Sequence, residues 1–212
     1  PETNLLQGEG TIFYTNNSPD TLSQLVIQLR QNIHKAGTIR NREVEITGGM
    51  NISKVRVNGQ PYLERRRRSR LGYNIRGTQM YIELYSPVRP GETVELEFNW
   101  HFQIPGDDAP RMGQDGEVFF LGYWYPQMAV YDDIEGWDEN HYMGNGEFYM
   151  GYADYDVKIS VPDGWIIAAT GALQNPEDVL SSESLAKLEK ARESDEPTTI
   201  VGKSEQFPGV ST

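Results

Sequence analysis

The feature that most constrains the fold is an alternation of apolar and polar residues along residues 93–104. An α-helix has about 3.6 residues per turn and would spread these apolar side chains around its axis, whereas a β-strand places all of them on one face. The segment is therefore predicted to be a long, half-buried strand. Its apolar positions, which we expect in the core, are Val94, Leu96, Phe98, Trp100, Phe102 and Ile104.

A second alternating stretch covers residues 79–85, and the sequence PVRPG at residues 87–91 separates the two stretches. Proline and glycine at this spacing are typical of a turn. We therefore predict that the two strands pair as an antiparallel hairpin.

Further strands are expected from shorter patterns of the same kind. Asn58 and Gly59 form a favoured tight-turn pair, which predicts that the strand before them folds back onto Tyr62 and Leu63. Pro162, Asp163 and Gly164 are expected to connect two more strands. The predicted strands are residues 11–15, 24–29, 44–47, 52–57, 154–161 and 165–170.

One stretch near the C-terminus is predicted to be helical. Asn175 is a suitable cap, Pro176 suits a first helical position, and residues 182–192 place Leu185 and Leu188 on one face. The predicted fold class is therefore all-β. Many short strands with frequent turns are typical of a β-sandwich of antiparallel sheets, here with a short helical excursion near the C-terminus.

The composition excludes several classes of function. The chain has 212 residues and a net charge of −12, which disfavours nucleic acid and anionic membrane surfaces as partners. It has no cysteine, so disulfides, thiolate metal sites and cysteine nucleophiles are impossible. No apolar run approaches the length of a membrane-spanning helix, so no membrane span is expected in this chain.

Most of the negative charge lies in one window, residues 112–157, which contains no Lys or Arg and many aromatic residues. One interpretation is an acidic, aromatic-lined cleft that attracts a cationic group. The other is a solvated acidic surface around aromatic core residues. The acids are Asp115, Glu117, Asp132, Asp133, Glu135, Asp138, Glu139, Glu147, Asp154 and Asp156.

No complete catalytic or metal motif is present. His34, His101 and His141 lack the spacing of a zinc site, and no Gly-x-Ser-x-Gly occurs. Residues 132–140 are rich in oxygen ligands but do not match the EF-hand order, which leaves a non-EF calcium site open. The basic run at residues 65–70 is predicted to be a solvated connection. We therefore predict no catalytic residue and no metal ligand within this chain, with the non-EF calcium site as the alternative.

Several pieces, in their order along the chain, resemble the N-terminal β domain of M1-family zinc aminopeptidases. The resemblance covers nearly the whole chain. Within the family, the chain is most similar to a bacterial subgroup. It departs from the family at Gln127, where the family has a cysteine, and in a long insertion at residues 134–146. The matching pieces are Trp124-Tyr125-Pro126, Asp132-Asp133, residues 153–162 and Ala168-Ala169-Thr170-Gly171.

The resemblance implies a saddle-like β-sandwich in which residues 1–212 form a single N-terminal domain, cut from a larger metallopeptidase. The family's His-Glu-x-x-His and Gly-x-Met-Glu-Asn motifs are absent, so zinc and catalysis are expected in a downstream catalytic domain, and no activity or cofactor is expected in this chain. The domain would form one wall of the active-site cleft. Its partners would be that catalytic domain and the N-terminus of a peptide substrate.

The resemblance also implies a site. In this family a Glu or Gln shortly before the aromatic-Pro segment, which is Trp124-Tyr125-Pro126 in this chain, binds the free α-amino group of the substrate. By position, Glu117 is the best match and Gln114 the second. A carboxylate suits this role because it forms a charge-assisted hydrogen bond with an ammonium group. A surface acid next to a strand is the alternative for Glu117. By the same resemblance, a periplasmic or secreted location is expected rather than a cytoplasmic one.

Two functions of other classes remain open. The chain could be a stand-alone binding module for carbohydrate or calcium that uses the acidic, aromatic loop at residues 131–156. It could also be an adhesion or assembly domain without a ligand.

Overall fold

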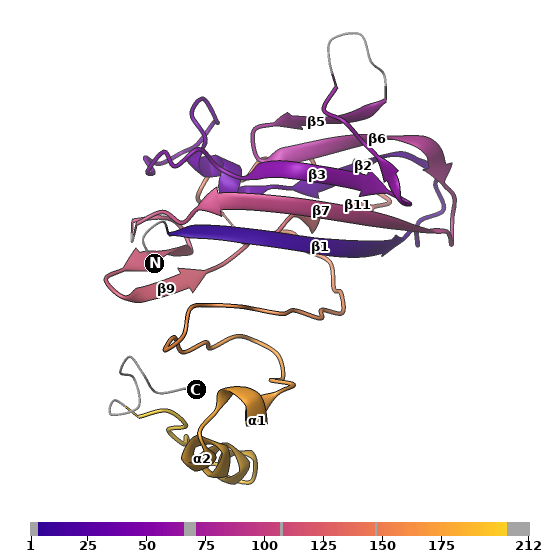
Figure 1. Ribbon diagram of the computed structural model, residues 1–212. Helices are drawn as coiled ribbons and strands as arrows, with labels where there is room; N and C mark the ends of the chain where they lie inside the picture. Colours follow the sequence, from indigo (N-terminus) through magenta and orange to yellow (C-terminus); the bar gives the residue numbers. More distant parts are fainter. Residues whose placement is uncertain (1–3, 66–70, 107, 147, 203–212) are drawn as a thin grey trace. The chain divides into compact units, whose positions relative to one another are not determined.

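The computed structural model describes residues 4–65, 71–106, 108–146 and 148–202 (Figure 1). These residues divide into two compact units, with the boundary between Ala153 and Asp154. All strands lie in the first unit and both α-helices lie in the second. The regular structure is mostly antiparallel β-sheet, which confirms the predicted all-β class.

The first sheet has the order β1-β7-β3-β4, and all of its strand pairs are antiparallel. Strand β7 pairs with β1 along its whole length, from Leu5 opposite Gln103 to Thr15 opposite Thr93. The strands are β1 (Leu5–Thr15), β3 (Asn51–Val57), β4 (Gln60–Pro61) and β7 (Thr93–Gln103).

The second sheet has the order β10-β2-β6-β5 and is also antiparallel. Its central pair, β2 and β6, aligns Leu25 with Ile82 and Ile27 with Met80. Figure 1 shows its strands behind those of the first sheet. The strands are β2 (Leu22–Gln28), β5 (Gly72–Arg76), β6 (Gln79–Val88) and β10 (Gln127–Met128).

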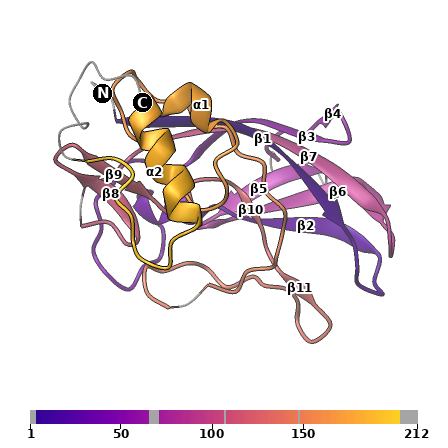
Figure 2. The same ribbon diagram turned by 90° about the horizontal axis from the view of Figure 1, so that it is seen from below.

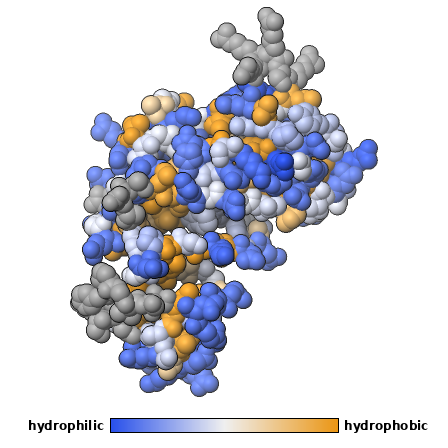
Figure 3. All heavy atoms as spheres, in the orientation of Figure 1, coloured by the Kyte–Doolittle hydropathy of each residue, from blue (hydrophilic) through white to orange (hydrophobic). Residues whose placement is uncertain are grey.

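The core lies between the two sheets. Leu25, Ile82, Leu96 and Phe98 are each at most 1% exposed and belong to one cluster of packed side chains. Along β7 every second residue is buried, as the alternation predicts. The polar residues of β7 face outward, and the part of the first unit that is turned to the viewer in Figure 3 is mostly hydrophilic.

The predicted hairpin of β6 and β7 is wrong. The turn at residues 87–91 instead carries the chain from the second sheet to the first, so the two strands face each other across the core. Both strands carry a row of buried apolar side chains on one face, and stacking face to face buries these rows against each other.

Three of the short strands are confirmed, and three are not. Residues 11–15 and 52–57 lie within β1 and β3, and the predicted strand at residues 24–29 lies within β2 except for Leu29, which follows the end of β2 at Gln28. The Asn58-Gly59 turn is also confirmed, with both residues at positive φ, and Tyr62 N–H donates to the Val55 carbonyl at 2.9 Å.

Residues 44–47 form a loop instead of a strand, because their polar groups bond elsewhere. The carbonyl of Glu45 bonds the His34 ring, its carboxylate accepts the Gly106 N–H at 2.7 Å, and Thr47 N–H donates to the His34 carbonyl. Residues 154–161 and 165–170 also have no strand assignment, and Val157 and Ile159 are exposed. In the described part of the chain no strand pairs with them, so the alternation lacks the neighbour that a ladder requires.

The remaining elements are short. The predicted C-terminal helices are confirmed, and the Ser181 hydroxyl caps α2 by accepting the Ser184 N–H at 3.1 Å. Among the described residues no helix is long and apolar enough to cross a membrane. Most of these elements are labelled in Figures 1 and 2. They are η1 (Arg30–His34), β8 (Met112–Asp115), β9 (Val118–Leu121), β11 (Tyr131–Asp132), β12 (Gly136–Trp137), α1 (Pro176–Val179) and α2 (Ser182–Arg192).

The buried 3₁₀ turn η1 gives the fold a pH dependence through His34. Its Nδ1 lies 2.9 Å from the Glu45 carbonyl, and its buried Nε2 has no hydrogen-bond partner among the described residues. Burial lowers the pKa of His34 below the ordinary 6.5. The unfolded chain therefore binds the proton more readily than the folded chain. The contribution of neutral His34 to the free energy of unfolding is complete above about pH 6.5, and it falls as the pH drops through that value.

We expect the urea midpoint of the wild-type protein to fall more steeply between about pH 7.5 and pH 5.5 than that of His34→Gln, whose amide does not titrate. The measurement is urea unfolding followed by circular dichroism at several pH values. Equal pH dependence in the two proteins would show that His34 does not contribute.

Candidate functional site

The two residues predicted to bind substrate lie in the small hairpin of β8 and β9. Asp115 pairs with Val118, so Gly116 and Glu117 form its two-residue turn. Gly116 has φ +57, a value that favours glycine and closes the turn. Glu117 therefore projects from the tip and is exposed, whereas Gln114 is half-buried within β8.

The side chain of Gln114 is occupied by contacts within the chain. Its Nε2 donates to the Gly116 carbonyl at 2.9 Å, and its Oε1 accepts from Asn4 Nδ2. The carboxylate of Glu117 makes no hydrogen bond or ion pair with any residue that the structure describes. Of the two candidates, Glu117 is thus the one whose polar atoms are available to a ligand.

The aromatic-Pro segment that follows the hairpin is fixed against both sheets. The indole Nε1 of Trp100, on β7, donates to the Trp124 carbonyl at 2.9 Å, and the two rings lie 6.3 Å apart. Gln127 then pairs with Gln28 as β10 joins the edge of the second sheet. The hairpin is therefore attached directly to the packed part of the fold.

The segment at residues 131–142 lies along the outer face of the second sheet and is held by side-chain amides. Gln28 and Gln79 both donate to the Asp138 carbonyl, at 3.3 and 3.2 Å, and Gln79 also donates to the Asn140 carbonyl at 3.2 Å. Trp137 anchors the same segment by donating to the Gln24 carbonyl at 3.0 Å.

The acids of the window do not converge on one point. Asp132 accepts the N–H groups of Ile134 and Glu135 at 3.0 and 2.9 Å, and these bonds lower its pKa. Asp138 accepts from Asn140 in the same way. Glu147 lies outside the described residues, and Asp154 and Asp156 belong to the second unit. The others are exposed, namely Asp115, Glu117, Asp133, Glu135 and Glu139.

The calcium hypothesis finds no support in this arrangement. Across residues 4–65, 71–106, 108–146 and 148–202, no three His, Cys, Asp or Glu side chains are grouped closely enough to hold a metal ion. Asp132 and Asp138 each use carboxylate oxygens to bond nearby N–H groups, which is a structural role in turns.

Sequence analysis missed a buried arginine next to the aromatic-Pro segment. Arg30 is only 4% exposed, its Nη1 donates to Gln127 Oε1, and its guanidinium lies 4.5 Å from the centre of the Phe148 ring. Burial lowers the pKa of Arg30, although four tyrosine and aspartate neighbours oppose this effect. Gln127 thus has a role here as the acceptor for a buried cation.

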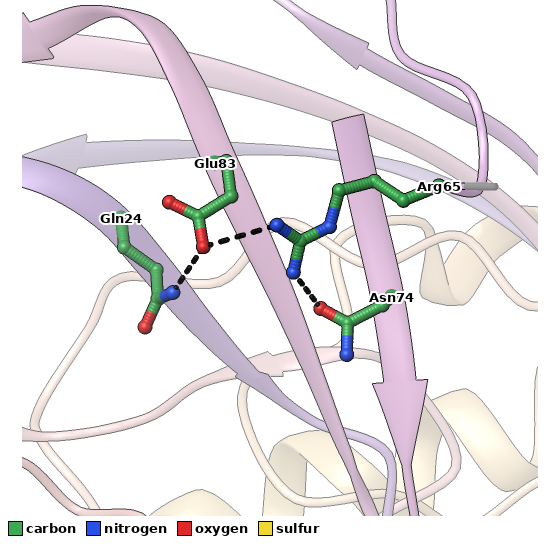
Figure 4. Close-up of polar contacts among 4 residues, drawn as sticks. All are labelled: Gln24, Arg65, Asn74 and Glu83. Carbon is green, nitrogen blue, oxygen red and sulfur yellow. Dashed lines mark hydrogen bonds and ion pairs between the residues drawn. The ribbon is translucent and has the colours of Figure 1, made fainter. Parts of the chain in front are cut away.

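The basic run is not wholly solvated, as Figure 4 shows for its first residue. Arg65 Nη1 lies 3.4 Å from Glu83 Oε1, and Nη2 donates to Asn74 Oδ1. Glu83 Oε1 also accepts from Gln24 Nε2 at 2.7 Å. This network joins three strands of the second sheet to residue 65, whereas the rest of the run, residues 66–70, lies outside the described residues.

Comparison with known proteins gives a limited likeness. No protein-family model matches the chain, and no curated protein matches it. Among solved structures, an M1 zinc metallopeptidase from Deinococcus radiodurans, in a mutant form, has a TM-score of 0.36 and 17% identity over 56% of this chain. The same organism's M1 zinc metallopeptidase has a TM-score of 0.32 and 19% identity over 50% of this chain.

A two-domain M1 zinc metallopeptidase mutant bound to L-arginine has a TM-score of 0.34 and 21% identity over 56% of this chain. The matches cover 22%, 18% and 21% of those three proteins. The chain thus spans about a fifth of the length of the structures it resembles.

Proposed function

We propose that this chain is the non-catalytic N-terminal domain of an M1-like zinc aminopeptidase and that it helps to bind the free N-terminus of a peptide substrate. In this proposal the zinc ion and the catalytic groups belong to a downstream domain, which is also the chain's main partner. The order of the sequence motifs supports the family, and the position of Glu117 supports the role.

The observation that carries the proposal is the free carboxylate of Glu117 at the tip of the β8–β9 hairpin. Its neighbour Gln114 is bonded within the chain, but Glu117 is exposed and has no partner among the described residues. The aromatic-Pro segment that the hairpin leads into is fixed by Trp100. A carboxylate that is free of internal bonds and carried on a rigid base is suited to bind an external cation.

The chemistry follows from charge and hydrogen bonding. Glu117 would accept a charge-assisted hydrogen bond from the substrate ammonium group and would thereby select peptides with a free N-terminus. The exposed acids Asp115, Asp133 and Glu135 would raise the local concentration of cationic substrates without contacting them. Salt would screen that contribution more than the direct contact.

The test uses the full-length protein and the variant Glu117→Gln, which keeps the size of the side chain and removes its charge. We expect kcat/KM for aminoacyl substrates with a free amine to fall by about tenfold or more, equivalent to about 1.4 kcal/mol. N-acetylated substrates, which lack the ammonium group, should be hydrolysed poorly by both forms. Asp115→Asn, at the other end of the turn, is the matched control and should change kcat/KM by much less.

Two results would contradict the proposal at different levels. If the full-length protein shows no zinc-dependent hydrolysis of aminoacyl substrates, the enzyme family is wrong. If that activity is present but Glu117→Gln leaves free-amine kinetics unchanged, the family stands and the assignment of Glu117 is wrong.

A further inference from the structure

Strand β1 forms a long sheet edge with little of the usual protection. It is the outermost strand of the first sheet, runs for 11 residues and pairs with β7 without a break in register. It contains no proline, lysine or arginine, and Glu9 is its one charged residue. Natural sheets normally protect such an edge with charges, prolines, bulges or short strands, because its free backbone groups bind other strands.

The outermost strands at the other edges of the two four-stranded sheets are short or covered. Strands β4 and β10 are two residues long, and β4 ends in Pro61. The outer side of β5 is covered by residues 63–65, with Tyr73 N–H donating to the Leu63 carbonyl at 3.0 Å. Among the edges that the structure describes, β1 therefore differs from the rest.

The register shows which groups of β1 point outward. Ile104 N–H donates to the Asn4 carbonyl at 2.8 Å, and Asn16 N–H donates to the Glu92 carbonyl at 2.9 Å. Hydrogen-bonded and non-hydrogen-bonded pairs alternate in an antiparallel ladder, so the even-numbered residues of β1 bond β7. The odd-numbered residues, from Leu5 to Thr15, direct their N–H and C=O groups to the free edge, and they have no backbone partner in the described part of the chain.

We propose that β1 pairs with β1 of a second copy of this chain, so that two first sheets join edge to edge around a twofold axis. A strand paired with itself in antiparallel orientation makes the isologous contact that a twofold dimer requires. An axis at Gly10 aligns every outward-directed residue of one copy with one of the other. The pairs are Leu5 with Thr15, Gln7 with Phe13, and Glu9 with Thr11.

This register is better than its neighbours for two reasons. Moving the axis to Glu9 would place Glu9 directly opposite its own copy, and like charges in that position are destabilising. Moving the axis to Thr11 would leave Leu5 without a partner inside the strand. With the axis at Gly10, the side chain of Phe13, which is 70% exposed, lies beside that of Gln7 and loses part of its contact with water.

The first test measures the mass of the 212-residue chain by light scattering after size exclusion over about a hundredfold range of concentration. We expect a species of twice the monomer mass of 24.1 kDa at the higher concentrations. Thr11→Pro removes an outward N–H and leaves the bonds to β7 in place, and proline is tolerated at an edge of this kind. It should raise the dimer Kd by about tenfold or more, because the ring also blocks the approach of a second strand.

Thr11→Val is the matched control, since it keeps the backbone N–H and the shape of the side chain, and it should dimerise like the wild type. A monomer at every concentration would overturn the proposal. A dimer that survives in Thr11→Pro with native circular dichroism would overturn it as well, because the contact would then lie elsewhere.

A second measurement tests the register and does not depend on the folding of the proline variant. The chain has no cysteine, so Gln7→Cys and Phe13→Cys each introduce a single thiol. A short thiol cross-linker should join the two variants when they are mixed, but should not join Gln7→Cys to itself, because those positions would lie about 20 Å apart. Self-linking of Gln7→Cys without linking in the mixture would contradict the register.

Discussion

Replacing Trp100 with alanine is expected to lower the free energy of unfolding by about 3–5 kcal/mol. Trp100 is 6% exposed and belongs to the core between the sheets. The truncation leaves a cavity between β1 and the aromatic-Pro segment. It also leaves the Trp124 carbonyl without the donor that now lies 2.9 Å away. The measurement is urea unfolding followed by far-ultraviolet circular dichroism, which reports on the backbone and does not need the tryptophan signal.

The matched control is Asn99→Ala on the same strand. Asn99 lies on the outward face of β7, where its side chain has no hydrogen bond to the residues that the structure describes. Its replacement should change the stability by less than about 0.5 kcal/mol. A loss below about 1 kcal/mol for Trp100→Ala would contradict the burial of this side chain.

The second large effect is expected at Gly8, on the strand next to Trp100. A Cβ atom at Gly8 would lie 2.3 Å from Cζ2 of the indole ring, whereas a Cβ at Gly10 would lie 3.5 Å away, an ordinary contact. Gly8→Ala should therefore destabilise the protein by about 1–3 kcal/mol through overpacking. Gly10→Ala, the matched control, should be close to neutral or slightly stabilising.

The same pair of residues offers a test of the cause. If the indole ring is what excludes a methyl group at position 8, then Gly8→Ala should cost much less in a Trp100→Ala background, and the two effects should not add. Fully additive effects would show that Gly8→Ala acts through the backbone and not through the ring.

The sequence predicted the faces of the strands better than their partners. Alternation along β7 identifies the buried side of each residue because side chains of a strand point alternately to its two faces. It contains no information on which strand lies beside it, so the sequence predicts one hairpin of β6 and β7 although they belong to different sheets. The same limit applies to residues 154–161, whose alternation is clear but which have no neighbouring strand in the described chain.

The sequence proposes Glu117 and Gln114 as site residues by their position before the aromatic-Pro segment, and this assignment stays a prediction. Only the contacts of Gln114 in the structure distinguish the two. Arg30 could not have been found, because a buried cation stabilised by Gln127 and Phe148 depends on residues about a hundred positions away along the chain. An arginine between strands is normally interpreted as a surface residue.

The attachment of residues 131–142 by Gln28 and Gln79 has a consequence for how the chain tolerates change. The two glutamines bond main-chain carbonyls at Asp138 and Asn140, and every amino acid supplies a carbonyl. Substitutions at the exposed positions Asp133, Ile134 and Glu135 can therefore vary the chemistry of this surface without loosening its attachment. A library randomised at those three positions should retain mostly folded members, whereas one randomised at the two glutamines should not.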